Sequence, residues 1–220
     1  MSYQNLIKTC FLVITSGQEV NKLHRNRLRG VKTGIVLTGS HCTIADVIPQ
    51  IKLLKEEGAI IHPIMSYTVD GIDNRFYQAA DLKNELGAIT DEPIINTITG
   101  AEPIGPVNYL DIVAVIPATG NTIAKLANGI VDTPALMAIK AQLRNQKPVV
   151  IGISTNDALS LNARNIGSLL NMKNIYFIPF RQDNPHSKAN SILFDMELVV
   201  DTICLALQGK QIQPVLLGPA

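Results

Sequence analysis

The sequence predicts an α/β fold, a three-layer sandwich in which a mostly parallel sheet is covered by helices on both faces. Two features of the 220-residue chain indicate this fold. Short apolar runs, typical of buried strands, alternate with segments whose apolar residues recur at helical spacing. Turns rich in Gly, Ser, Thr, Asn and Pro separate them. Strands that alternate with helices are joined by right-handed crossovers and therefore lie parallel.

Residues 1–30 differ from the segment that follows. A short apolar run, "IKTCFLVITSG", precedes a basic stretch, "NKLHRNRLRG". A secretory signal has the opposite order, with positive charge ahead of its apolar core. We therefore expect residues 1–30 to be an N-terminal extension: a poorly ordered arm, a stretch ahead of the true start, or an arm that docks on a partner subunit. Residues 31–220 then form one domain.

The first half of that domain shows the alternation clearly. The first helix is expected to end at Gly58, because glycine suits the end of a helix. The second strand contains Pro63, which lacks an N–H and favours an edge position. Pro117 is expected to stop the third strand. The predicted elements are strands at 31–37, 59–65 and 110–117, with helices at 44–57 and 73–86.

The second half continues the pattern up to a long final helix. That helix is predicted from Ile192, Met196, Val199 and Ile203, which would share one face. The predicted elements are helices at 123–130 and 134–145, a strand at 147–153, a helix at 160–171, a strand at 174–180 and the final helix at 188–208.

Four polar turns follow predicted strands: "TGSH", "SYTVDG", "PATGNT" and "ISTND". In parallel α/β sheets, ligands bind beyond the carboxyl ends of the strands. The first turn, Thr38, Gly39, Ser40 and His41, also precedes a helix, whose unpaired N–H groups and dipole favour an anion. One interpretation is a phosphate site. The other is a plain N-cap, in which Ser40 or Thr43 caps the helix.

The other turns combine small and polar residues. "PATGNT" comprises Pro117, Ala118, Thr119, Gly120, Asn121 and Thr122. Its small residues would let a flat ring lie against the backbone, and its polar side chains supply donors and acceptors. Capping of the next helix is the alternative. In "ISTND", Thr155 and Asn156 are candidates for binding a small-molecule substrate, and an Asx turn is the alternative.

Composition narrows the classes of function. With 19 basic and 18 acidic residues the chain lacks the positive charge that nucleic-acid binding requires. No apolar run is long enough to span a bilayer. Three widely spaced cysteines indicate reduced thiols in a cytoplasmic protein. The low charged fraction, 17%, indicates a surface covered by a partner or another copy, or simply a large buried sheet.

No local pattern assigns catalytic residues or metal ligands. The sequence has no HExxH motif, no nucleophile–base pair at local spacing and no carboxylate pair. The histidine in the second strand, His62, is expected to be a packed core or edge residue. Lys125 could assist a carboxylate or be solvated. The chemistry is therefore expected to come from a cofactor.

Two segments carry a family resemblance. "PATGNTIAKLANGIVD", followed by "KPVVIGISTND", resembles the homo-oligomeric flavin-containing cysteine decarboxylases and their flavoprotein relatives, over residues 31–180. The resemblance implies a Rossmann-like sheet with FMN at subunit contacts of a trimer or dodecamer. It also implies that "TGSH" holds the FMN phosphate, that Ser66 and Thr68 flank the cofactor, that "PATGNT" lies along the isoalloxazine, and that Asn156 matches the asparagine of the family's Pro-x-Met-Asn segment.

Departures from the family pattern argue against cysteine decarboxylation. The family's catalytic histidine is absent from "TGAEPIGPVNYLD", and its Pro-x-Met-Asn segment has become Ile153-Ser154-Thr155-Asn156. "GIVLTGSHCT", "AEPIGP" and "KNIYFIPFRQDNP" resemble one branch of the family. That branch implies an oxidoreductase subunit whose partner subunit uses NADP. A decarboxylase or prenyltransferase of the same family, or a non-catalytic scaffold, are the alternatives.

Overall fold

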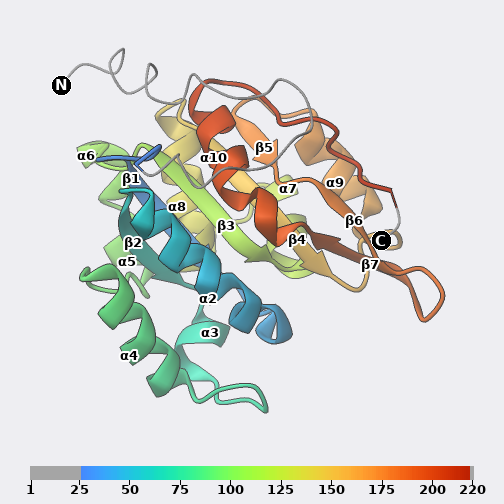
Figure 1. The fold of residues 1–220 in the computed structure, drawn as a ribbon, viewed down its shortest axis with the longest axis horizontal. Coiled ribbons are helices and arrows are strands. Elements are labelled where there is room, and N and C mark those ends of the chain that lie inside the picture. The colour runs from blue at the N-terminus through green and yellow to red at the C-terminus, as the bar shows by residue number, and fades with distance from the viewer. Residues whose placement is uncertain (1–25, 219–220) are drawn as a thin grey trace.

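A computed structural model describes residues 26–218, which form a seven-stranded sheet with helices on both faces (Figure 1). The sheet order is β2-β1-β3-β4-β7-β6, and β5 also pairs with β4. The parallel strands are β1 (Lys32–Leu37), β2 (Ile60–Met65), β3 (Ile112–Ala118), β4 (Val149–Thr155) and β5 (Ile175–Phe177). The antiparallel strands are β6 (Phe180–Asn184) and β7 (Lys188–Phe194). The predicted fold class is confirmed.

The central strands are apolar because helices cover both faces of the sheet. Every residue of β3 is buried, and so are the first six of β4. The edge strand β2 carries Pro63, as the sequence predicts. Pro117 does not stop β3, which continues to Ala118, but the pairing of β3 with β4 shifts register between Val115 and Ala118.

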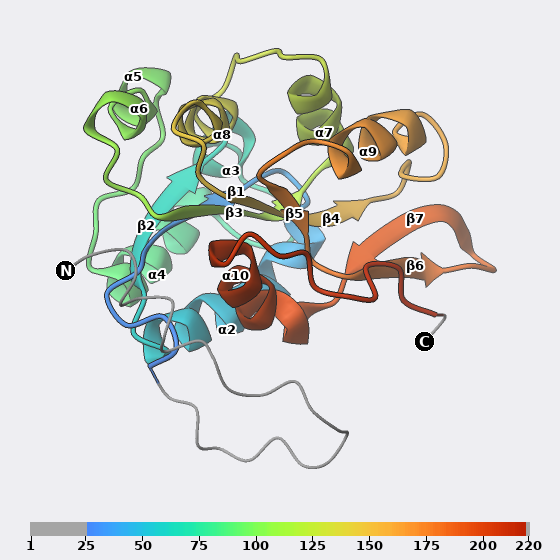
Figure 2. The same cartoon turned by 90° about the horizontal axis from the view of Figure 1, so that it is seen from above.

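The helices form two layers. Figure 2 shows α7, α8 and α9 on one face of the sheet and α2 and α10 on the other. Within the described residues, no helix is long and apolar enough to cross a membrane. The bounds are α2 (His41–Glu56), α3 (Tyr67–Gly71), α4 (Ala79–Thr90), α5 (Ile98–Ala101), α6 (Ile104–Val107), α7 (Gly120–Ala127), α8 (Pro134–Arg144), α9 (Ala163–Leu170) and α10 (Val199–Leu207), with a 3-10 turn at Met196–Leu198.

The order of the strands reverses between β1 and β3. From β1 the chain passes through α2 to β2 at one edge, whereas from β3 it passes through α7 and α8 to β4 on the other side. The turns that leave β1 and β3 therefore diverge to opposite faces. In open α/β sheets such a reversal leaves a crevice at the carboxyl ends of the strands, where ligands bind.

The helix predicted at 73–86 is displaced in the structure. The α4 helix begins at Ala79 and runs through Gly87 to Thr90. Side-chain oxygens hold residues 73–78 in a loop instead: Asn74 Oδ1 accepts from the backbone N–H groups of Phe76 and Tyr77, and Asp73 Oδ1 accepts from that of Ala79. Such local bonds compete with helix formation, which explains why the apolar spacing was misleading here.

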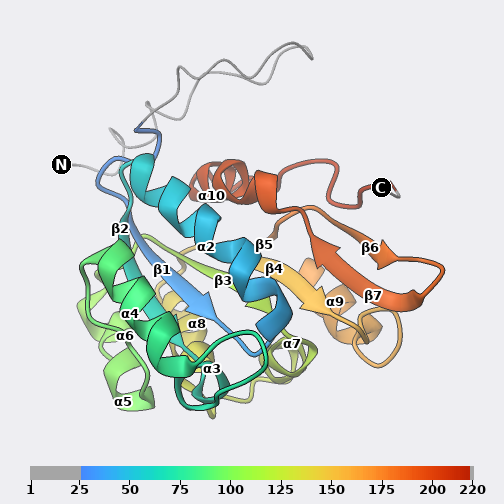
Figure 3. The same cartoon turned by 60° about the horizontal axis from the view of Figure 1, so that its bottom comes forward.

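The prediction of a helix at 188–208 was wrong over the first half of that range. Residues Lys188–Phe194 form β7, which pairs antiparallel with β6 and with the end of β4, and α10 begins only at Val199. Asn184 Oδ1 accepts from the N–H groups of His186 and Ser187 and so forms the turn of this hairpin. Figure 3 shows the hairpin projecting from the sheet. The strand predicted at 174–180 is divided at 178–179 into β5 and β6.

Residues 26–30 pack on the domain. The side chain of Leu28 is fully buried in the core. Arg27 donates two side-chain hydrogen bonds to Glu57 Oε1, at 3.0 and 3.1 Å, and its backbone N–H donates to Glu57 Oε2. These contacts anchor the chain just before β1. The rest of the predicted N-terminal extension, residues 1–25, lies outside the described residues.

Truncation of Leu28 tests this anchoring. Leu28→Ala should lower the free energy of unfolding by about 2–5 kcal/mol, because it removes buried contacts and leaves a cavity. Leu161, which is 80% exposed, is the control; Leu161→Ala should change this free energy by less than about 0.5 kcal/mol. Denaturant titrations of the full chain at one protein concentration measure both. Equal stability of Leu28→Ala and the unaltered protein would contradict the packing described above.

Candidate functional site

Thr38 joins the two strands that flank the crevice. It follows β1 directly and is 1% exposed. Its hydroxyl donates to the carbonyl oxygen of Pro117 at 2.7 Å and accepts from the backbone N–H of Thr119 at 3.0 Å. The bonds satisfy two backbone groups where the β3 ladder is irregular. Thr38 thus fixes "TGSH" beside "PATGNT", at the reversal of strand order.

Three hydroxyl groups tie the start of α2 to β4. Ser154 Oγ lies 2.7 Å from both Ser40 Oγ and Thr43 Oγ1, and the latter two are 3.1 Å apart. Ser40 occupies the N-cap position of α2 but makes no side-chain cap bond. The plain N-cap interpretation of Ser40 was therefore wrong. The first N–H groups of an α-helix lack intrahelical acceptors, so the uncapped end of α2 suits an anion.

Gly39 allows the turns after β1 and β2 to approach each other closely. A Cβ atom at this position would lie 2.9 Å from Thr68 Oγ1 and 3.6 Å from His41 Nε2. Ser66 Oγ lies 3.1 Å from Thr68 Oγ1. Four of the predicted cofactor residues therefore gather here, and a side chain at position 39 would displace Thr68.

His41 is held by the loop that precedes α4. Its Nδ1 atom lies 2.6 Å from Tyr77 Oη and 3.2 Å from Asn74 Nδ2. Burial lowers the pKa of His41 and raises the pKa of Tyr77. Both side chains are therefore neutral near neutral pH. Neither Asn74 nor Tyr77 was a predicted site residue, because the sequence pattern had assigned them to a helix.

The "PATGNT" turn both caps α7 and contributes to the crevice. Thr119 is the N-cap residue, and its hydroxyl accepts from the N–H of Thr122 at 3.3 Å. Pro117 and Ala118 are buried at the end of β3, whereas Asn121 is exposed. Thr119 therefore caps α7, as the alternative interpretation of this turn expected. Asn121 is the residue of this turn with a side chain open to a ligand.

Gly120 packs tightly against the turn after β4. A Cβ atom there would collide with Asp157 Oδ1 and would lie 2.6 Å from Asn162 Nδ2 and 2.8 Å from Thr155 Oγ1. Asp157 accepts hydrogen bonds from Thr155 Oγ1 at 2.6 Å and from Asn162 Nδ2 at 2.9 Å. The small size of Gly120 therefore serves this contact between "PATGNT" and "ISTND".

The hydroxyl proton of the predicted substrate residue Thr155 is thus directed at Asp157, while Asn156 is exposed. Asn162, which bonds Asp157, is held in turn by Asn165: Asn165 Nδ2 donates to Asn162 Oδ1 at 2.9 Å. Both asparagines are buried. Asp157, Asn162 and Asn165 form a polar support that the sequence pattern alone does not reveal. Lys125, which could have assisted a carboxylate, pairs with Asp132 at 2.6 Å.

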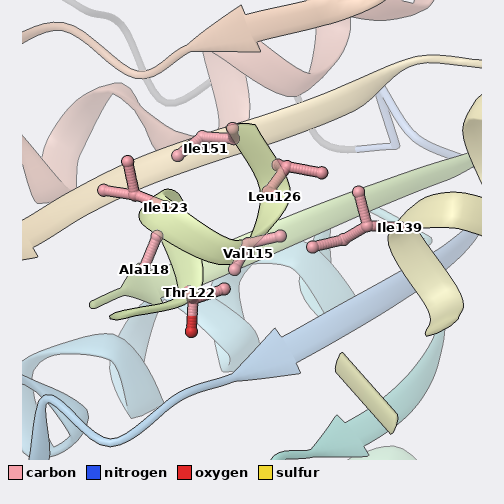
Figure 4. A pocket seen from close by; sticks show the side chains of 7 residues that line it. All are labelled: Val115, Ala118, Thr122, Ile123, Leu126, Ile139 and Ile151. Carbon is pink, nitrogen blue, oxygen red and sulfur yellow. The ribbon is translucent and has the colours of Figure 1, made fainter. Parts of the chain in front are cut away.

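The inner side of α7 is apolar and closed. Figure 4 shows Val115, Ala118 and Ile151 of the sheet meeting Thr122, Ile123 and Leu126 of α7, with Ile139 of α8 beside them. The space that they line has no room for a water molecule. It fixes α7 on the sheet and is no ligand site. Among the described residues, no cluster of His, Cys, Asp or Glu could hold a metal ion.

The fold and its polar turns define a class: an α/β protein whose strand order reverses between β1 and β3, with polar turns at that point. A flavodoxin-like strand order, 2-1-3-4-5, binds FMN at the corresponding point. The same order occurs here in β2-β1-β3-β4, with β5 beside β4. The sequence model of the flavoprotein family matches residues 21–207. The chain belongs to this family.

Within the family, two B subunits of dipicolinate synthase are similar to this chain over most of its length. The B subunit of dipicolinate synthase from Bacillus subtilis (strain 168) is 47% identical over 189 residues, which is 86% of this chain and 94% of that protein. The crystal structure of the B subunit of dipicolinate synthase from Bacillus halodurans has a TM-score of 0.80 at 49% identity, and the match covers 87% of this chain and 98% of that one.

A more distant structure shares the fold. An FMN-dependent cysteine decarboxylase has a TM-score of 0.61 at 20% identity, covering 82% of this chain and 99% of the other. At that identity the likeness concerns the fold alone.

The hydroxyl of Thr38 should contribute to the free energy of unfolding through its two hydrogen bonds with backbone groups. Thr38→Val keeps the shape but leaves Pro117 O and Thr119 N–H without their partner, so the free energy of unfolding should fall by about 1–3 kcal/mol. Thr33 is the matched control: it is fully buried in β1, and its hydroxyl has no partner among the described residues.

Thr33→Val should be neutral or stabilising, because it removes a buried hydroxyl that forms no bond. Urea titrations of both variants give the comparison. Similar losses of stability in the two variants would show that the bonds of Thr38 contribute nothing particular.

Replacement of Gly120 tests the contact between the turns. Gly120→Ala should cost about 1–3 kcal/mol of folding free energy, because the added methyl group displaces Asp157 and Asn162. Gly167→Ala is the control, since Gly167 lies in α9 with no atom within 4 Å of the added Cβ. That change should stabilise by about 0.5–1 kcal/mol through helix propensity. A stable Gly120→Ala protein would mean that the turns separate easily.

Proposed function

We propose that this chain is the B subunit of a dipicolinate synthase and that it binds FMN at the crevice between β1 and β3. The observation that carries the cofactor assignment is the reversal of strand order, with an uncapped helix end and a glycine at its centre. In this proposal Gly39, Ser40 and His41 meet the phosphate, with Thr68 opposite. Thr38 and Ser66 support that arrangement from behind.

The flavin ring would lie beside the turn after β3. Asn121 offers a donor and an acceptor there, and Thr119 and Thr122 hold the turn in place. A bound flavin supplies two-electron redox chemistry. In this proposal the residues of this chain orient the ring, and the closed apolar contact between α7 and the sheet keeps water from entering beneath the turn.

The substrate proposed is dihydrodipicolinate, a ring with two carboxylates, which the complete enzyme oxidises to dipicolinate. Asn156 is the exposed donor at the end of β4. The four turns at the crevice contain no Lys or Arg, but they do contain Asp70 and Asp157. Neutral amide donors alone do not balance two negative charges in a partly desolvated site. We therefore propose that cationic groups come from another chain.

That other chain is, in this proposal, the A subunit of dipicolinate synthase, which would also bring NADP. The low charged fraction of the chain is consistent with covered surfaces, and exposed apolar side chains such as Val107 and Ile130 are available for them. Self-association into a trimer or dodecamer is the second assembly that we propose. The place of action would be the mother-cell cytoplasm of a spore-forming bacterium.

Two alternatives from the sequence remain distinct from this proposal. A decarboxylase or flavin prenyltransferase would act without the A subunit. A scaffold would bind no flavin and would leave the whole oxidation to that partner. The uncapped end of α2 favours a ligand-binding chain over a scaffold.

The proposal is tested by absorption spectroscopy and by reconstitution. The purified chain is incubated with FMN and gel-filtered, and its visible spectrum is recorded. Oxidation of dihydrodipicolinate is then measured with the A subunit alone, with this chain alone and with both. Retained flavin, together with turnover that requires both chains, is the expected result. Full turnover by the A subunit alone, with no flavin retained by this chain, would favour the scaffold.

Asn121→Ala should weaken FMN binding by about 5–30-fold while leaving the fold intact, because an exposed side chain that bonds only the ligand contributes about 1–2 kcal/mol. Fluorescence titration of FMN measures the affinity. Asn128→Ala, at the end of α7 but bonded to Ala124 O within that helix, is the control and should bind FMN as the unaltered chain does. If the two variants bound FMN equally, the ring would lie elsewhere.

A further inference from the structure

Asn74 is oriented by the backbone of its own loop. Its Oδ1 atom accepts from the N–H of Phe76 at 2.9 Å and from that of Tyr77 at 3.3 Å. An amide oxygen accepts and an amide nitrogen donates, so these bonds determine which end of the side chain faces which way. The Nδ2 atom of Asn74 must then be the group that lies 3.2 Å from His41 Nδ1.

It follows that His41 Nδ1 carries no proton. An amide N–H can only donate, so Nδ1 accepts from Asn74, and Tyr77 Oη, 2.6 Å away, has the same nitrogen as its partner. A neutral imidazole that accepts at Nδ1 carries its proton on Nε2. Burial lowers the pKa of His41 and so agrees with the neutral ring.

The protonated nitrogen faces the candidate anion site. Nε2 lies 3.6 Å from the position that a Cβ atom of Gly39 would occupy, and Thr68 Oγ1 lies 2.9 Å from that position. Nε2 thus lies beside Gly39 at the start of α2, and a phosphate held there in the proposed FMN site would lie on the Nε2 side of the ring. The remaining bonds of His41 run in the opposite direction, to the loop at 72–78.

We propose that Asn74 and Tyr77 are positioning residues that hold His41 as a neutral Nε2–H donor to a phosphate oxygen of the ligand. The inference rests on the proposed FMN site and deepens it. Asn74 and Tyr77 touch no ligand themselves; they select the tautomer and fix the ring. The site thereby receives a hydrogen-bond donor without a buried positive charge. The loop before α4 becomes part of the cofactor site, although its residues lie more than thirty positions after His41.

The Asn74→Asp variant tests the tautomer directly. An aspartate can still accept from the N–H groups of Phe76 and Tyr77, but it replaces the donor toward His41 with an acceptor. The neutral ring should then move its proton to Nδ1 and turn a lone pair toward Gly39. Nitrogen NMR of ring-labelled histidine distinguishes the two tautomers in the free protein.

At alkaline pH we expect His41 to be protonated at Nε2 in the unaltered chain and at Nδ1 in Asn74→Asp. An Nδ1-protonated ring in the unaltered chain, or the same tautomer in both proteins, would overturn the proposal. Asn171→Asp, an equal change at an exposed residue at the end of α9, should leave the His41 signals as they are. Tyr77→Phe should keep the Nε2 proton, because Asn74 still donates.

Ligand affinity supplies the second measurement. At alkaline pH, Asn74→Asp should bind FMN about 10-fold more weakly or worse, since a donor has become a lone pair that faces phosphate. At lower pH the introduced carboxylate favours the doubly protonated ring, so affinity should recover. A loss that is equal at every pH would indicate mere disruption of the loop and would count against the proposal.

Failure of the cofactor assignment can be told apart from failure of this inference. If the unaltered chain bound no FMN, the proposed function would be wrong, and inorganic phosphate would serve as the probe. A phosphate-dependent shift of the Nε2 signal of His41 would still support the positioning role. No response to phosphate in a protein with the expected tautomer would overturn it.

Discussion

The contact between β1 and β3 is the constraint on which the rest of the structure depends. These strands are the centre of a sheet covered on both faces, so their backbone groups have no access to water and must find partners within the protein. At the end of the ladder, where the register of β3 shifts, the buried hydroxyl of Thr38 takes over this task. One side chain thereby completes the sheet and places two turns side by side.

The polar groups at the carboxyl edge divide into those that hold the turns and those that remain open. The hydroxyls of Ser40, Thr43 and Ser154 bond one another, and Asp157 is occupied by Thr155 and an asparagine. A turn rich in hydroxyls is thus largely self-supporting. What it presents outward is backbone N–H at the start of α2 and a few exposed amides, such as those of Asn121 and Asn156. In the function that we propose, such a site would recognise an anion through rigid neutral donors.

The fold was predictable because buried parallel strands must be apolar and helices must show periodicity. The turns that carry the candidate site were placed correctly at the ends of the strands, since they follow the strands directly in the sequence. Three features were not predicted from the sequence: the β6–β7 hairpin, the loop at 72–78 and the support of Asp157 by Asn162. Each depends on side-chain bonds to the backbone or across the sheet. Hydrophobic spacing contains no information about such bonds, and at 188–194 it was compatible with a helix and a strand alike.

The charge at the crevice argues for a division of roles between chains. A phosphate can be held by helix N–H groups and neutral side chains, since one end of it remains near solvent. In the function that we propose, a ring dicarboxylate enclosed above a flavin would have no contact with solvent, and the carboxylate of Asp157 stands at the same edge. A chain that supplied its own cations could turn over alone. In the function that we propose, the neutral donors of the four turns would hold the cofactor, and a partner would supply the positive charge that a dianion requires.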